Sequence, residues 1–363
     1  MPTVEPNRDT RILVTGGNGF IGMWVIRTLL EQGYSVRGAI RSLEKGMGLR
    51  DYFLNSNVEW VVVKDFYKDG GFDNAVKDVD AIIHMASPVT TDSEDPDAYI
   101  KPAVDGTLSL LKSAARVGKS VKRVVFTSSC AAVIGPVNKP NTIFNEDNWA
   151  DESVRITEEK GKDAPDLTKY RASKTLAEKA AWKFYNEHKA EIGWDLVALN
   201  PSLPTLLDPK KPHQLNASLA TWWKIITKKD VSDEELKQTY AFIDVRDIAS
   251  AHVVALSKAE AGGERMIISN ALTRPYATGA ITWQETPTDT LAAGNIINSL
   301  QPKLYASGIL PRGKPDLDKT ISYDYDGSKG KRILGLKYRS KEETFSDTLA
   351  DFEARRWLEK PVE

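Results

Sequence analysis

Three glycines between an apolar run and a helical segment constrain the fold of this chain more than any other feature. Ile12–Val14 is typical of a buried parallel strand, and residues 24–30 form a helical segment without a breaker. Gly16, Gly19 and Gly22 lie between them. In the strand–turn–helix unit that binds a dinucleotide, the first glycine forms the tight turn, the second lets the backbone approach a pyrophosphate, and the third lets the helix pack closely. A flexible turn is the competing interpretation, so the rest of the chain must decide.

The alternation of strands and helices continues along the chain and predicts an α/β fold. Amphipathic helical segments occupy residues 99–117 and 168–189. Short apolar runs typical of strands occur at residues 34–40, 58–63, 81–86, 121–129 and 195–201. Such a sheet is parallel, is covered by helices on both faces, and binds ligands at the carboxyl ends of its strands. We therefore predict a Rossmann-type, doubly wound parallel sheet with a smaller C-terminal substrate lobe.

The chain changes character after Pro201, and this change suggests where the lobe is built. Four prolines fall within residues 201–212, and the sequence beyond residue 270 is only weakly periodic. Between these stretches, a helix over 248–256 and a strand over 264–269 are predicted, and a final helix is predicted near 341–358. We therefore predict three parts, which are a flexible N-terminus over 1–10, a dinucleotide-binding domain over 11–201 and 241–270, and a substrate-binding lobe over 202–240 and 271–363.

Charge and composition exclude several classes of partner and site. The net charge of −1 gives no basic field that would favour nucleic acid or an anionic membrane. Cys130 is the only cysteine, which excludes an internal disulfide, and we interpret it as a buried residue in preference to a reactive thiol. The four histidines show no metal-ligand spacing, so we expect no catalytic metal. No window approaches about 18 continuous apolar residues, so we expect a cytoplasmic protein without a membrane span.

Tyr170 and Lys174 stand four residues apart in a helical segment and therefore share one face. A tyrosine with a pKa of about 10 is a poor acid at neutral pH, but a nearby ammonium favours the phenolate and lowers that pKa. The pair thus predicts a general acid supported by a lysine. Lys174 can also donate to the sugar hydroxyls of a dinucleotide. The alternative is that both side chains lie on an ordinary solvated helix face.

A hydroxyl group is predicted at the carboxyl end of the strand over 121–129, where Thr127, Ser128 and Ser129 follow one another. Hydroxyls at this place face the crevice where doubly wound sheets bind ligands. Ser129 can donate a hydrogen bond to a carbonyl oxygen and stabilise the charge that develops there. Taken alone, the same serine would be interpreted as a cap of the strand end.

The glycine turn, Ser129 and the Tyr170-x-x-x-Lys174 pair together resemble the extended short-chain dehydrogenase/reductase family. Within it the chain is most similar to the dihydroflavonol reductase-like branch and to fungal NADPH-dependent carbonyl reductases of the methylglyoxal and aldehyde reductase type. The matching segments include residues 36–42, 84–88, 123–129, 174–182 and 243–249, and the resemblance fades beyond residue 270. It implies that Ser129, Tyr170 and Lys174 are the catalytic triad, with Ser128 as the alternative serine.

The second predicted strand favours NADP over NAD as the cofactor. An NAD site requires an acidic residue near the end of this strand, whereas a 2′-phosphate requires cations. Residues 34–43 contain no acid but contain Arg37 and Arg41, and Lys45 follows closely. We expect Arg41 to contact the phosphate with Lys45 nearby, and we expect Arg37 to be an ordinary structural charge.

The resemblance implies further cofactor contacts. Phe20 and Ile21 join the glycine turn, Asp65 lies near the adenine, and Ala86, Ser87 and Pro88 line the pyrophosphate and ribose. Pro201, Ser202 and Leu203 contact the nicotinamide amide. The family usually places Gly-Pro a few residues later, but residues 204–209 lack that glycine, so the path of this loop does not follow from the resemblance.

These features support an NADPH-dependent reductase that converts an aldehyde or ketone to an alcohol. In this hypothesis Ser129 holds the carbonyl oxygen, Tyr170 delivers the proton, and Lys174 supports both the tyrosine and the ribose. One alternative is a nucleotide-sugar epimerase or dehydratase with the same fold and triad, and another is a dinucleotide sensor without catalysis. Trp222 and Trp223 are interpreted as core of the lobe, and we expect a monomer or homodimer that acts on a small carbonyl substrate.

Overall fold

The computed structural model describes most of the chain. The residues that it does not describe fall in short gaps before residue 93, in longer gaps after residue 205, and at the two termini. The described residues are 3–42, 53, 57–87, 93–205, 215, 218–221, 223, 232, 239–270, 280–282 and 322–358. Lys45, Pro88 and Trp222, three residues considered above, lie outside them, as does most of the stretch after Thr205.

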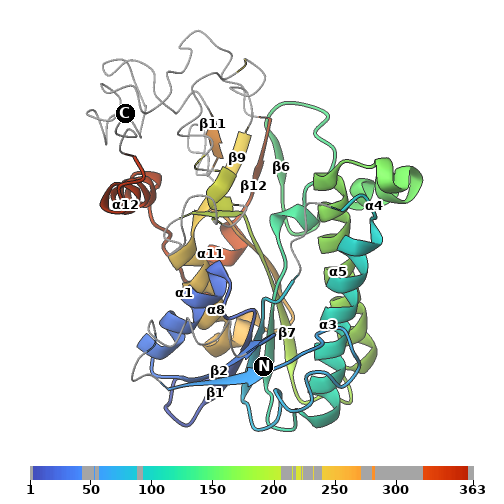
Figure 1. Cartoon of the computed structure of the whole chain (residues 1–363), viewed down its shortest axis with the longest axis vertical. Coiled ribbons are helices and arrows are strands. Elements are labelled where there is room, and N and C mark those ends of the chain that lie inside the picture. The colour runs from blue at the N-terminus through green and yellow to red at the C-terminus, as the bar shows by residue number, and fades with distance from the viewer. Residues whose placement is uncertain are drawn as a thin grey trace.

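A seven-stranded parallel sheet forms the centre of the described structure (Figure 1). The strand order is β10-β7-β5-β4-β1-β2-β3, which is the doubly wound order with the first strand near the middle. The strands are β1 (Arg11–Thr15), β2 (Ser35–Ile40), β3 (Val58–Val62), β4 (Ala81–His84), β5 (Arg123–Thr127), β7 (Asp195–Pro201) and β10 (Arg265–Ile268). The predicted Rossmann-type fold is therefore confirmed.

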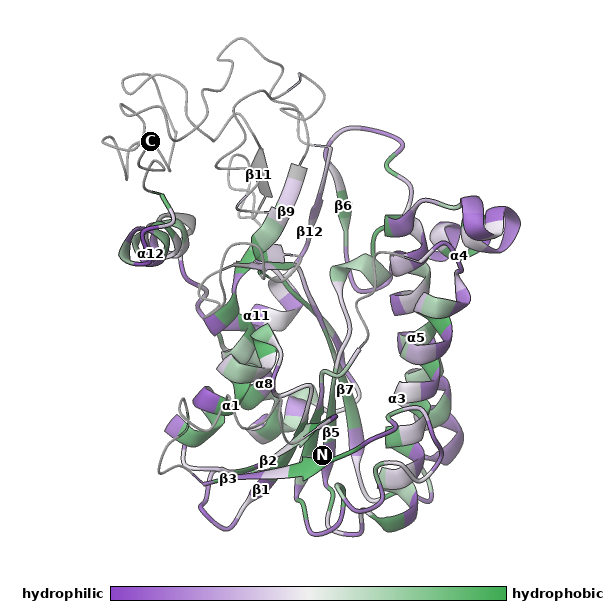
Figure 2. Ribbon diagram, in the orientation of Figure 1, coloured by the Kyte–Doolittle hydropathy of each residue, from purple (hydrophilic) through white to green (hydrophobic). Residues whose placement is uncertain are grey.

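Helices cover both faces of this sheet. In Figure 1, α1 (Phe20–Glu31) and α8 (Val245–Ser257) lie on one side, and α3 (Asp97–Val117) and α5 (Asp166–His188) lie on the other. Successive residues of β1 serve the two cores, since Ile12 and Val14 pack toward α1 and α8 while Leu13 packs toward α3 and α5. This explains why the central strands are mostly apolar, which Figure 2 shows as green ribbon along β5 and β7.

Smaller elements lie beside the carboxyl ends of the strands. β8 (Leu203–Thr205), β9 (Thr239–Asp244) and β11 (Ala280–Thr282) form a three-stranded sheet, and β6 (Thr142–Phe144) pairs with β12 (Tyr323–Tyr325). The helices here are α4 (Asp151–Lys160), α11 (Ser328–Leu334) and α12 (Lys341–Ala354), with short 3₁₀ turns η2 (Cys130–Ala132) and η3 (Gly161–Asp163). A further 3₁₀ turn, η5 (Ala259–Ala261), follows α8 at the opposite end of the sheet. The division into cofactor domain and substrate lobe stays a prediction.

Two helices, α1 and α8, begin about one turn earlier than the sequence predicted. α1 begins at Phe20, directly after Gly19, rather than at residue 24. α8 begins at Val245 rather than at residue 248, because the Asp244 carboxylate accepts a hydrogen bond from the backbone nitrogen of Arg246 and caps the helix.

The segment expected to be a flexible N-terminus is anchored at Val4. This side chain is buried, its backbone nitrogen donates to the Leu256 oxygen at 2.9 Å, and its own oxygen accepts a 2.8 Å bond from the Tyr34 hydroxyl. Among the described helices, none has both the length and the apolar character needed to cross a membrane.

Candidate active site

The glycine turn between β1 and α1 has the conformation that the first and third glycines were predicted to permit. Gly16 has φ +70°, and a Cβ there would lie 3.0 Å from the Ala86 nitrogen. Gly22 lies in the first turn of α1, where a Cβ would lie 2.3 Å from the Gly16 oxygen. Gly19 is the N-cap of α1 and makes no side-chain cap, and the first turn, which includes Phe20 and Ile21, carries no acidic residue. The helix thus presents backbone N–H groups, a suitable site for a phosphate.

A hydrogen-bonded cluster holds this turn against the end of β4. The Thr15 hydroxyl lies 2.7 Å from His84 Nδ1 and accepts bonds of 3.1 Å from the backbone nitrogens of Met85 and Ala86. Burial and the charge of Lys174 lower the pKa of His84 to about 3, so its ring is neutral. The predicted contact residues Ala86 and Ser87 therefore lie beside the glycine turn.

Ser129 and Tyr170 meet at the carboxyl end of β5. Tyr170 is half-buried on α5, and the Ser129 side chain lies near enough to its phenol to lower the pKa of that phenol. The Ser129 hydroxyl also accepts a 3.1 Å bond from the backbone nitrogen of Ala131, so it caps η2 as well as facing the tyrosine. Ser128 points elsewhere, because it is buried and donates to the Glu178 carboxylate at 2.6 Å.

The pKa of Tyr170 departs from its usual value in the direction opposite to the one predicted. Burial raises the pKa, and the neighbouring Ser129 side chain opposes this effect without cancelling it. The sequence-based expectation that Lys174 lowers this pKa is therefore wrong for this structure, because removing the phenolate from water outweighs the influences that favour it. As a result, Tyr170 holds its proton at neutral pH.

Lys174 is buried one helical turn after Tyr170. Burial lowers the pKa of its ammonium to about 8, while the negative charge of Glu178 raises it. Glu178 follows one further turn along the same face of α5. The stripe of Tyr170, Lys174 and Glu178 therefore carries an acid, a cation and an anion in succession.

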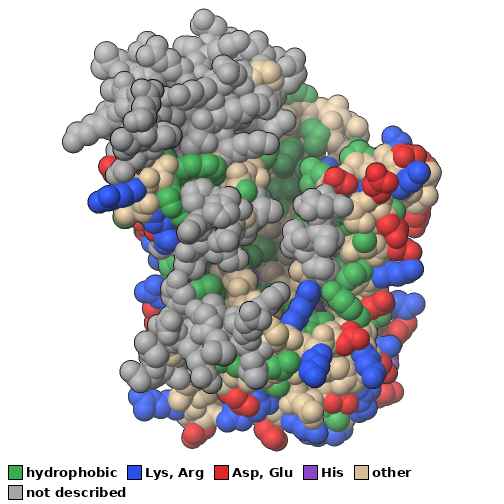
Figure 3. Space-filling view, in the orientation of Figure 1, with side chains coloured by type: hydrophobic (Ala, Val, Ile, Leu, Met, Phe, Trp, Pro, Cys, Tyr) green, Lys and Arg blue, Asp and Glu red, His purple; other side chains and the backbone are tan. Residues whose placement is uncertain are grey.

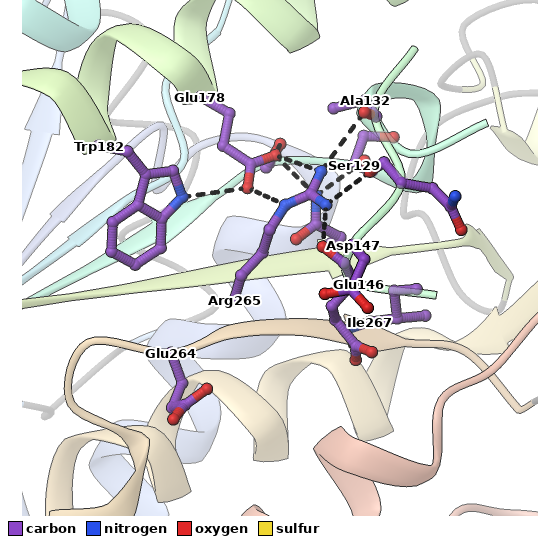
Figure 4. Close-up of polar contacts among 12 residues, drawn as sticks. Ser129, Ala132, Glu146, Asp147, Glu178, Trp182, Glu264, Arg265 and Ile267 are labelled. Atoms are coloured by element: carbon purple, nitrogen blue, oxygen red, sulfur yellow. Dashed lines mark hydrogen bonds and ion pairs between the residues drawn. The ribbon is translucent and has the colours of Figure 1, made fainter. Parts of the chain in front are cut away.

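Glu178 is the centre of a buried polar network that sequence reasoning missed (Figure 4). Its carboxylate accepts bonds from Arg265 Nε at 2.6 Å and from Asn200 Nδ2 at 2.8 Å, in addition to Ser128. Asn200 Nδ2 also donates to the Ser129 backbone oxygen at 3.1 Å. The network therefore connects α5 to the backbone that carries Ser129. The sequence did contain a signal for this network, because Lys174 and Glu178 stand four residues apart among the small apolar residues of the same helix.

Arg265 has a partner for each of its donors in this network. Nη1 donates to the backbone oxygens of Glu146 and Asn148 at 2.7 Å each, and Nη2 donates to the Ala132 oxygen at 3.3 Å. The guanidinium also lies over the ring of Trp149, 3.7 Å from its centroid. The arginine thus holds the segment after β5 as well as Glu178.

A cavity of about 700 Å³ opens beside these residues. Ser129 and Tyr170 line it, as do Pro201, Ser202 and Leu203, the residues predicted to contact the nicotinamide amide. Figure 3 shows a hollow with hydrophobic side chains at this level of the molecule. The segment after Pro201 continues as β8, which pairs in parallel with β9, and this fixes the first part of the loop that lacks Gly-Pro.

The residues predicted to bind the adenosine half lie at the ends of β2 and β3. Arg41 is exposed just after β2, 5.6 Å from the Phe66 ring centroid, and Asp65 is exposed and accepts backbone bonds from Tyr67 and Lys68. Arg37 is buried and donates to Glu59 and to the Ala75 oxygen. Arg41 is thus available to a ligand, while Arg37 serves the fold.

Two other predictions concern residues near the cavity and in the lobe. Cys130 is buried, and its thiol donates to the Asn200 oxygen at 3.2 Å. Trp223 packs edge-on against Phe352, with 5.2 Å between ring centroids, and against Trp357 at 6.1 Å. The interpretation of Cys130 as a buried residue is confirmed, whereas Trp223 is only partly buried and its assignment to the core stays a prediction. No cluster of three potential metal ligands occurs in the part of the chain that the structure describes.

The chain is similar to a known protein family and to reductases of known name. Residues 12–269 match the model of the NAD dependent epimerase/dehydratase family. The chain is 33% identical to the NADPH-dependent methylglyoxal reductase GRE2 of Saccharomyces cerevisiae, with 95% of this chain and 99% of that protein covered. It is 32% identical to aldehyde reductase 2 of Sporidiobolus salmonicolor, with 93% and 94% covered.

A solved structure agrees with these relatives. The structure of yeast methylglyoxal/isovaleraldehyde reductase Gre2 complexed with NADPH superposes with a TM-score of 0.79 at 30% sequence identity. The superposition covers 95% of this chain and all of that one. The similarity therefore extends beyond the cofactor-binding half.

Proposed function

Because the chain belongs to the NAD dependent epimerase/dehydratase family, we propose that Ser129, Tyr170 and Lys174 carry out an NADPH-dependent reduction of an aldehyde or ketone. The protein is an oxidoreductase of the extended short-chain dehydrogenase/reductase type and uses NADPH. Its relatives that carry reductase names match it over almost the whole chain. The observation that carries the assignment of residues is that Ser129 and Tyr170 line the same cavity, where Ser129 is near enough to influence the pKa of the phenol.

The roles of the three residues follow from their surroundings. Burial raises the pKa of Tyr170, so the phenol is protonated and can deliver a proton to the oxygen of a substrate carbonyl. The Ser129 hydroxyl donates to the same oxygen and stabilises the developing negative charge. Lys174, with a pKa of about 8, is mostly charged at neutral pH and favours the tyrosinate that remains after the proton has left.

Several groups of this chain fit NADPH. The glycine turn and the first turn of α1 would hold the pyrophosphate, because Gly16 and Gly22 leave no room for a side chain and the helix end is uncapped. Arg41 would hold the 2′-phosphate, with Lys45 as a further contact, and Lys174 would hold the ribose. Asp65, Ala86, Ser87, Pro88 and Pro201–Leu203 are proposed as the remaining contacts. When bound, NADPH supplies the hydride.

The test is consumption of NADPH with a panel of aldehydes, diketones, ketoesters and UDP-sugars, repeated with NADH. We expect net oxidation of NADPH by aldehydes or ketones and slower oxidation of NADH. Tyr170→Phe should lower kcat by about 10²–10⁴-fold, because the proton donor is lost, while NADPH binding stays unchanged. Turnover of UDP-sugars without net loss of NADPH would favour the epimerase alternative, and indifference to Tyr170→Phe would favour a sensor.

We also propose the finer points that the sequence suggests about the protein as a whole. The division into a cofactor domain over 11–201 and 241–270 and a substrate lobe over 202–240 and 271–363 accords with the place of β10 in the main sheet. We propose a cytoplasmic protein that acts as a monomer or homodimer. Gel filtration tests the oligomeric state, limited proteolysis tests the division into domain and lobe, and cell fractionation tests the location.

A further inference from the structure

The cavity beside Tyr170 has an unusual distribution of charge. Arg171 is the only Lys, Arg, Asp or Glu among its described lining residues. Burial raises the pKa values of Cys130, Tyr170 and Tyr325, so these groups are uncharged at neutral pH. The described wall of the cavity therefore has one formal charge, and it is positive.

Among the residues that the structure describes, the Arg171 guanidinium has no hydrogen-bond or ion-pair partner, unlike the buried arginines of the protein. The residue is nevertheless half-buried. By contrast, Arg123 is paired with Asp195, Arg246 with Asp244, and Arg265 with Glu178. A guanidinium has five N–H donors in a planar fork and cannot lose its charge in a protein. Five donors at the wall of a partly apolar cavity favour an anionic oxygen ligand.

The direction of the side chain is indicated by the residues that it affects. Arg171 opposes the rise in pKa that burial causes at Tyr323 and Tyr325 of β12. The guanidinium therefore acts across the cavity from α5 toward β12, and both tyrosines line the same space. Leu167, one turn earlier on α5, is exposed and also lines it.

Arg171 follows the proton donor directly in the chain. Neighbouring residues on a helix differ by about 100° in direction and about 1.5 Å along the axis, so they face adjacent parts of one cavity. A substrate whose carbonyl oxygen lies between Ser129 and Tyr170 therefore has Arg171 beside the rest of its chain. Two fixed points of this kind, an oxygen-binding pair and a cation, select a molecule with a carbonyl and an anion.

We propose that Arg171 determines specificity by binding a carboxylate of the substrate, so that the enzyme acts on keto acids or aldehyde acids. This inference rests on the reductase function proposed above. It makes Arg171 a substrate-binding residue that does not take part in proton or hydride transfer. A neutral aldehyde or ketone would use the same catalytic residues but would leave the guanidinium without its partner.

The experiment compares 4-oxopentanoate with its methyl ester in steady-state reduction by NADPH. The carbonyl is the same in both compounds, and only one carries a charge. We expect the wild-type enzyme to have the higher kcat/KM for the acid, and Arg171→Gln to lower that value by about 10–100-fold. The value for the ester should change by less than about threefold. Arg171→Lys should restore part of the loss, and Lys183→Gln, which removes an exposed cation from the same helix, should change neither value.

A binding measurement separates recognition from catalysis. Pentanoate, which has the carboxylate but no carbonyl, should inhibit reduction of the ester competitively in the wild type and fail to do so in Arg171→Gln. Equal losses for acid and ester, or a wild-type preference for the ester, would overturn the proposal. A preference for a phosphorylated hydroxyketone over the keto acid would overturn the carboxylate assignment. Failure to oxidise NADPH with any carbonyl compound would instead contradict the reductase function itself.

Discussion

Two buried arginine–carboxylate pairs lie at opposite ends of the same two strands, β5 and β7. Arg123 and Asp195 are the first residues of these strands and form two bonds of 2.7 and 2.8 Å. Arg265 and Glu178 form the second pair, beside the carboxyl ends, with a shortest bond of 2.6 Å. The two pairs are alike in chemistry and burial but differ in what else they hold.

The additional partners show the difference. Arg123 Nη1 donates to the backbone oxygens of Ala255 and Lys258, both at 2.6 Å, and so holds the end of α8 against the sheet. Glu178 instead accepts from Ser128 and Asn200, whose backbones lead into Ser129 and Pro201. One pair therefore stabilises the fold and the other positions the site, which the carboxyl ends of the strands provide in this class of sheet.

The largest effect is expected from Arg123→Met. The substitution leaves the Asp195 carboxylate and several carbonyl oxygens buried without a donor, so the free energy of unfolding should fall by about 3–5 kcal/mol. Urea denaturation measures this loss. The kcat of the folded fraction should stay unchanged, and a tenfold fall in that value would contradict the division of roles between the two ends.

Glu178→Gln should act mainly on catalysis. An amide at this position turns an N–H group toward the donors of Ser128 or Asn200, so the backbone at Ser129 shifts. We expect kcat to fall by about 10–100-fold. Glu187→Gln, an exposed change on the same helix, is the matched control. If the loss of activity merely follows the unfolded fraction measured by circular dichroism, Glu178 is structural only.

The pH dependence of kcat/KM tests whether Glu178 acts on the site through the charge of Lys174. Because the pKa of Lys174 is lowered to about 8, its ammonium loses the proton as pH rises through that value. If the charge is required, kcat/KM for NADPH, which reports the free enzyme, falls about tenfold per pH unit above about 8. Loss of the Glu178 charge removes an influence that raises this pKa, so Glu178→Gln should move the alkaline limb to lower pH. A flat profile through pH 8 would show that the charge of Lys174 is not needed.

The smallest effect is expected from an exposed cation at the cofactor end. Arg41→Ala should raise KM for NADPH by about three- to tenfold and leave KM for NADH unchanged, because the guanidinium is proposed to meet only the 2′-phosphate. Arg27→Ala, which removes an exposed cation from the second half of α1, serves as the control. An equal rise for both cofactors would remove Arg41 from the 2′-phosphate site.

The fold could be predicted because its strongest signals are local. Every strand of the main sheet except the edge strand β3 is a mostly apolar run buried on both faces, and the glycine turn is a backbone requirement that few other residues satisfy. β6 and β12 were not predicted, because each has three residues and they pair across a long sequence separation. α4 was missed because its sequence is mostly charged and shows little apolar stripe.

The residues of the site also fall into some that could be predicted from the sequence and some that could not. Tyr170, Lys174 and Ser129 could be proposed from spacing and position, since a helix and a strand end fix where such side chains lie. Glu178 and Arg171 could not be assigned partners, because one depends on Arg265 far along the chain and the other on the shape of the cavity. The rise in the pKa of Tyr170 was also out of reach, because burial by distant elements causes it.

The buried thiol of Cys130 lies at the wall of the cavity beside Tyr170, where a reactive cysteine would meet any carbonyl compound that binds. Aldehydes and dicarbonyls are electrophiles that form adducts with thiolates, and this sulfur lies at the wall of the space that receives them. Burial raises its pKa well above the usual value, and its hydrogen is engaged by the Asn200 oxygen. A thiol kept in its neutral form is a weak nucleophile. We therefore expect Cys130 to react only slowly with carbonyl compounds that enter the cavity.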